Sequence, residues 1–64
     1  MENATYFVYN NSEGEVIGVF SEIRSAITWA KENVSQDEEM TIYKGEPVCD
    51  VYLPYPEPCV DYRN

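Results

Sequence analysis

The chain has 64 residues, a formal net charge of -8 and no histidine, and it is therefore one domain at most, with a small core and marginal stability. Twelve acidic residues against four scattered basic ones argue against direct nucleic-acid binding, because neutralising phosphates requires clustered Lys and Arg. Such a charge instead suits a partner protein with a basic surface.

The N-terminal third of the chain predicts a β-hairpin. Residues 5–10 are aromatic and β-branched, as is typical of a strand, and the turn residues 11–14 precede a second extended run at 15–20. Alternation in the first strand puts Tyr6 and Val8 on one face of the sheet, and Phe7 and Tyr9 on the other. In the second strand it puts Val16 and Phe20 on one face of the sheet, and Ile17 and Val19 on the other.

An amphipathic helix is predicted next, over residues 22–33, with Ser21 as its N-cap. One helical face carries regularly spaced apolar side chains, namely Ile23, Ala26, Ile27, Ala30 and Val34. A single stripe of this kind is suited to packing on a sheet.

The remaining residues predict a second hairpin and a tail. Residues 40–43 and 48–53 read as strands, and residues 44–47 form the turn between them. The Pro-rich tail, residues 54–64, is expected to be extended over the surface or disordered, because alternate prolines cannot donate ladder hydrogen bonds. The order β-β-α-β-β over residues 1–53 therefore predicts an α+β domain of two layers, an antiparallel sheet of four strands with one helix on one face.

Catalytic and metal sites lack their usual residues. Without His, the common general base is missing, and the three glycines are isolated rather than part of a phosphate-binding loop. A structural zinc ion takes four Cys or His ligands, and only Cys49 and Cys59 are present. The acidic run at 36–39 lacks the spacing of a calcium-binding loop. We therefore expect no enzymatic activity, cofactor or metal.

A cytoplasmic location is expected, because the first residues lack the basic and apolar regions of a secretory signal and no apolar run is long enough to span a membrane. In that compartment Cys49 and Cys59 are reduced thiols by default, and a bridge between them is the less favoured alternative.

The aromatic side chains exceed what one helix can cover. Six tyrosines accompany two phenylalanines and Trp29, and the strands are apolar on both faces. Either the Pro-rich tail folds back over the second face, or that face is an interface, since Tyr and Trp are favoured at protein contacts. Trp29 lies beside the apolar stripe, where it either packs at the edge of the sheet or is a half-exposed anchor for a partner.

The acidic residues fall into separate groups along the chain. Glu13 and Glu15 flank the first turn, and Asp37, Glu38 and Glu39 follow the helix. Such charges ordinarily form a solvated surface that maintains solubility. The more specific hypothesis is a surface that mimics the phosphates of a nucleic acid.

In length, acidity and tyrosine content the chain resembles the small proteins that bacteriophages and other mobile elements encode. Several of those proteins inhibit host enzymes or defence complexes by occupying a binding surface. The resemblance implies a stoichiometric inhibitor or modulator of a host protein in the host cytoplasm, acting on a basic surface that binds nucleic acid. The alternative is an assembly module that forms a homodimer through its aromatic sheet face. The predicted partner-binding residues are Glu13, Glu15, Trp29, Asp37, Glu38, Glu39, Tyr43 and Tyr52.

Overall fold

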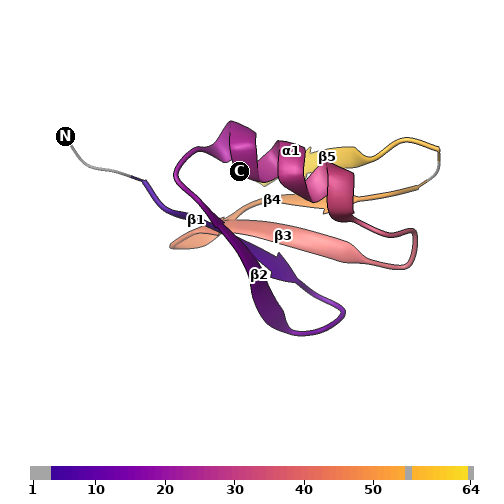
Figure 1. The fold of residues 1–64 in the computed structure, drawn as a ribbon, viewed down its shortest axis with the longest axis horizontal. Coiled ribbons are helices and arrows are strands. Elements are labelled where there is room, and N and C mark those ends of the chain that lie inside the picture. The colour runs from indigo at the N-terminus through magenta and orange to yellow at the C-terminus, as the bar shows by residue number, and fades with distance from the viewer. Residues whose placement is uncertain (1–3, 55, 64) are drawn as a thin grey trace.

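The computed structural model describes residues 4–54 and 56–63, which form one antiparallel sheet of five strands and one helix (Figure 1). The elements in chain order are β1 (Tyr6–Asn10), β2 (Glu15–Phe20), α1 (Ile23–Asn33), β3 (Glu39–Lys44), β4 (Glu46–Tyr52) and β5 (Cys59–Tyr62). The α+β class and the position of the helix on one face are confirmed. In the described part of the chain, the helix is too short and too polar to cross a membrane.

The strands lie side by side in the order β2-β1-β3-β4-β5. Both β2 and β3 pair with β1, so α1 connects them by crossing over β1 on one face of the sheet. This order makes β3 the central strand and puts β1, which is far from it in the sequence, beside it. Each hairpin turn contains a glycine with positive φ, 73° at Gly14 and 76° at Gly45, a conformation that other residues rarely adopt.

The C-terminal tail extends the sheet, so the predicted four strands become five. β5 pairs antiparallel with β4, with Val60 opposite Val51 and Cys59 opposite Tyr52. The three prolines of the tail, Pro54, Pro56 and Pro58, occupy the connection before β5, where no ladder N–H is needed. Of the expected domain and tail, residues 1–3, 55 and 64 lie outside the described residues.

The core lies between α1 and the face of the sheet that the helix covers. Val8 of β1, Ile42 of β3 and Val51 of β4 are fully buried there. The predicted helical stripe is confirmed, because Ala26 and Ala30 are also fully buried, and the other three stripe residues belong to the same cluster. Small alanine side chains let the helix lie close to the strands.

The N-cap prediction was wrong by one residue. Glu22, not Ser21, occupies the N-cap position, and no side chain there accepts a hydrogen bond from the first turn.

The alternation predicted for β2 was also wrong, because the strand contains a β-bulge. Gly18 lies opposite Val8, but the next pair joins Val16 to Tyr9, which leaves Ile17 as an extra residue. Val16 and Val19 therefore share the face away from the helix, while Phe20 packs against the core.

Candidate functional site

The sheet face away from the helix is uncovered by any other described element, and we call it the open face. Strand pairing assigns to it Phe7 and Tyr9 of β1, Val16 and Val19 of β2, Thr41 and Tyr43 of β3, Asp50 and Tyr52 of β4, and Cys59 and Asp61 of β5. The tail continues the edge of the sheet beside β4 and does not lie across this face. Of the two expected arrangements, the structure therefore has the uncovered face.

The half of the open face formed by β1 and β2 is apolar. Val16 and Val19 are 51% and 60% exposed, and the neighbouring Phe7 is 38% exposed. The rings of Tyr9 and Tyr43 meet edge to face, with centroids 5.9 Å apart. Aromatic pairs favour this geometry. Large apolar side chains gathered on one face are typical of a contact surface.

The other half of the open face holds a chain of hydrogen bonds centred on Asp50. Arg63 donates two of them, from Nε at 2.9 Å and from Nη2 at 2.8 Å. The Thr41 hydroxyl donates another at 2.7 Å, and Thr41 accepts one in turn from the Asn11 amide at 2.9 Å. The hydrogen bonds from Arg63 are the main reason that the pKa of Asp50 lies below its usual range. The tail is thereby fixed to β4.

The five acidic residues predicted to steer a partner come together at one end of the sheet, which we call the acidic end. It comprises Glu13, Glu15, Asp37, Glu38 and Glu39. Figure 1 shows why: the β1–β2 turn and the α1–β3 loop project from the same end. Pairing of β1 with β3 joins the two loops, and the Asn11 side-chain amide donates to the Glu39 carboxylate at 3.0 Å. Glu57, which sequence reasoning did not select, lies in the β4–β5 loop at this end.

Glu38 has a structural role within the acidic end. Its carboxylate accepts hydrogen bonds from the buried Asn10 side chain at 3.3 Å and from the Ser35 N–H at 3.1 Å. These bonds, that from Asn10 above all, lower the pKa of Glu38. Glu13, Glu15, Asp37 and Glu39 are exposed.

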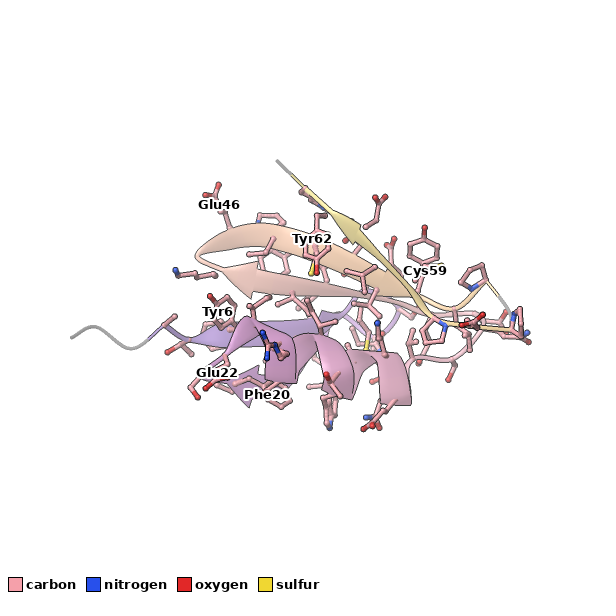
Figure 2. All side chains as sticks on the ribbon, turned by 90° about the horizontal axis from the view of Figure 1, so that it is seen from above. Tyr6, Phe20, Glu22, Glu46, Cys59 and Tyr62 are labelled. Carbon is pink, nitrogen blue, oxygen red and sulfur yellow. The ribbon has the colours of Figure 1, made fainter. Side chains whose placement is uncertain are left out.

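The opposite end of the molecule carries two exposed cations, Arg24 and Lys44. Lys44 Nζ lies 5.8 Å from the centroid of the Tyr6 ring, within the range of a cation–π contact. Figure 2 shows Tyr6, Glu22 and Glu46 at this end, and Cys59 toward the other. Glu22 and Glu46 thus balance the two cations at this end, whereas five carboxylates gather at the acidic end.

Trp29 packs at the β2 edge of the sheet, which is the first of the two arrangements expected for it. It is half-buried, and its ring centroid is 5.6 Å from that of Phe20. A Cβ added to Gly18 would lie 2.9 Å from Phe20 and 3.4 Å from Trp29, so the glycine lets both rings pack against the strand. A contact between Trp29 and a partner stays a prediction, as do those of Tyr43 and Tyr52 on the open face.

The two cysteines lie on opposite faces of the sheet and are unbridged. Cys49 is buried beneath the helix, and burial raises the pKa of its thiol. Cys59 is exposed on β5. Among residues 4–54 and 56–63, no three Cys, Asp or Glu side chains are grouped so as to hold a metal ion. Carboxylates and aromatic rings are among the groups that the described surface exposes.

Sequence reasoning missed part of this surface. The alternation in β1 placed Phe7 and Tyr9 correctly. The bulge in β2 put Val16 on a face that simple alternation did not predict, and no local pattern linked Arg63 to Asp50 across 13 residues.

Compared with models of protein families, with curated proteins and with solved structures, the chain shows no match.

Proposed function

We propose that the protein binds another protein through its acidic end and open face, and that it acts stoichiometrically as an inhibitor or modulator. One observation carries the proposal. The fold gathers five of twelve carboxylates at one end of a sheet whose uncovered face exposes aromatic and aliphatic side chains.

The two parts of the surface have different roles in this proposal. Carboxylates attract a basic partner over distances up to the Debye length, about 8 Å at physiological salt, and mainly speed association. The side chains of the open face lose water on contact and set the rate of dissociation. The contact begins at the edge strand β2 with Val16 and Val19, beside Phe7 of β1. Tyr43 and Tyr52 extend it toward β4.

The partner is proposed to be a protein of a bacterial host, with a basic surface that normally binds nucleic acid. Such surfaces have the highest density of Lys and Arg. In this case the protein and DNA compete for the same site, and raising the salt concentration weakens both complexes.

The test begins with the chain as bait in a bacterial lysate and continues with association and dissociation rates for each captured protein. The acidic-end variant combines Glu13→Gln, Glu15→Gln and Asp37→Asn. It spares Glu38 and Glu39, which hold the loops together. A control with the same change in net charge, placed away from the open face, combines Glu22→Gln, Glu32→Gln and Glu46→Gln.

The acidic-end variant should slow association by about tenfold or more at low salt, while the control variant changes it little. Tyr43→Ser should instead speed dissociation. Equal association rates for the two charge variants would show that the position of the carboxylates is irrelevant, and the proposal would fail.

A further inference from the structure

The two edges of the sheet are protected to different degrees. β5, at one edge, has four residues, follows a Pro-rich connection and carries Asp61. Short length, proline and charge are the features by which proteins prevent an edge strand from pairing with another chain. β5 has all three.

The other edge, β2, has little such protection. From Val16 to Phe20 the strand contains neither a charged residue nor proline. The backbone groups on its outer side have no partner strand in the described sheet. The bulge at Ile17 is the one protective feature, and it leaves Gly18, Val19 and Phe20 as a regular stretch. This edge can therefore accept a further strand.

Apolar side chains flank the same edge. Val16 and Val19 are more than half exposed on β2, and Phe7 lies opposite Val19 on β1. A strand added at β2 would bury part of the two valines, provided that its own side chains there are apolar. β2 itself meets that requirement.

The distribution of charge favours a second copy in the antiparallel direction. Glu15 begins β2 at the acidic end, and Phe20 ends it four residues before Arg24. Antiparallel pairing of two β2 strands puts the Glu15 end of each copy beside the Arg24 end of the other, where Glu22 offsets part of the positive charge. It also keeps the two acidic ends apart. Within the described residues the one ion pair joins Arg63 and Asp50, and Arg24 is exposed.

We propose that two copies of the protein pair antiparallel through β2, which continues the two five-stranded sheets into one sheet of ten strands. The bulge limits the contact, so the dimer forms at micromolar or higher concentration. It leaves the open faces of both copies uncovered on the same side. This differs from a dimer formed by packing two open faces together, which would bury Tyr43 and Tyr52.

Sedimentation of the full chain from micromolar to millimolar concentration tests the proposal, with amide hydrogen exchange as the structural readout. Exchange of β2 amides should slow as concentration rises, while that of β5 amides stays unchanged. Val19→Lys should raise the dimer dissociation constant by about tenfold or more, because two lysines then meet in a strand pair. Val19 is 60% exposed, so this variant should fold normally.

Two further variants locate the contact. Cys59→Lys introduces the same charge on the exposed side of β5 and should leave the dimer unchanged. Arg24→Glu should weaken the dimer several-fold, and adding Glu15→Lys should restore it. A monomer of 7.4 kDa at every concentration, or a dimer that Val19→Lys does not weaken and that leaves β2 amides unprotected, would overturn the proposal.

Discussion

The clearest test of the two faces of the sheet is one substitution made on each. Val8→Ala removes two carbon atoms from a side chain with 0% exposure on the interior strand β1. At about 0.8 kcal/mol per buried methylene the transfer loss is about 1.6 kcal/mol, and the cavity brings the total to about 2–3 kcal/mol. Val19→Ala makes the same chemical change on β2, but 60% of that side chain is exposed, so its cost should be about 0.5 kcal/mol or less.

Urea unfolding followed by Trp29 fluorescence and far-UV circular dichroism measures both costs. A chain of 64 residues has a free energy of unfolding of about 3–10 kcal/mol. Val8→Ala should thus remove a large share of it and lower Tm by about 10–20 °C. The dependence on denaturant should stay unchanged, since both variants expose similar surface on unfolding. If Val19→Ala costs as much as Val8→Ala, the assignment of the covered and open faces is wrong.

Three further predictions address single sites. The pKa of Asp50 is lower in the folded chain, chiefly through Arg63, so its contribution to stability is present above the ordinary Asp pKa of about 3.9 and is lost as pH falls through the folded value. In Arg63→Gln, an NMR titration of the carboxyl carbon should show the pKa of Asp50 closer to the ordinary value. An unchanged pKa would contradict the role of Arg63. Gly45→Ala should cost about 1 kcal/mol in urea unfolding, since φ is 76° and an added Cβ meets nothing within 4 Å; a neutral effect would mean that the turn readily changes conformation. A thiol reagent should modify Cys59 at once in the native protein and buried Cys49 only on unfolding, and equally fast reaction of both would refute the burial of Cys49.

Local patterns predicted the elements of the fold because each is repeated over several residues. The spacing of the helical stripe depends on five positions, and a single exception would not hide it. The first hairpin was equally clear, since aromatic and β-branched runs flank a turn that ends in Gly14. Fold class followed from these elements, because a helix with one apolar face needs one sheet face to cover.

Features that depend on pairing between distant residues escaped prediction. The bulge at Ile17 arises from the fit of β2 to β1 and changes which side chains share a face. The strand β5 has only four residues, one of them Asp61, and follows prolines, so nothing local distinguishes it from an exposed tail. It is held by pairing with β4 and by the bonds from Arg63 to Asp50.

The acidic end was likewise predictable in its residues but not in their arrangement. Its five residues were identified from the sequence as charged and near turns. Their arrangement into one surface depends on β3 lying beside β1, which the order of elements did not determine. The contacts of Glu38 and Glu39 with Asn10 and Asn11 could not be foreseen for the same reason.

The central pairing of β1 with β3 also has a consequence for folding kinetics. Each hairpin closes over a few residues, whereas the contacts of Asn10 with Glu38 and of Asn11 with Glu39 each span 28 residues. Non-local pairing of this kind is slow to form, so we expect two early hairpins and a later step that joins them. The acidic end is built across that junction. An opening that separates β1 from β3 would therefore split the five carboxylates into two groups, so the surface lasts only as long as these two strands stay paired.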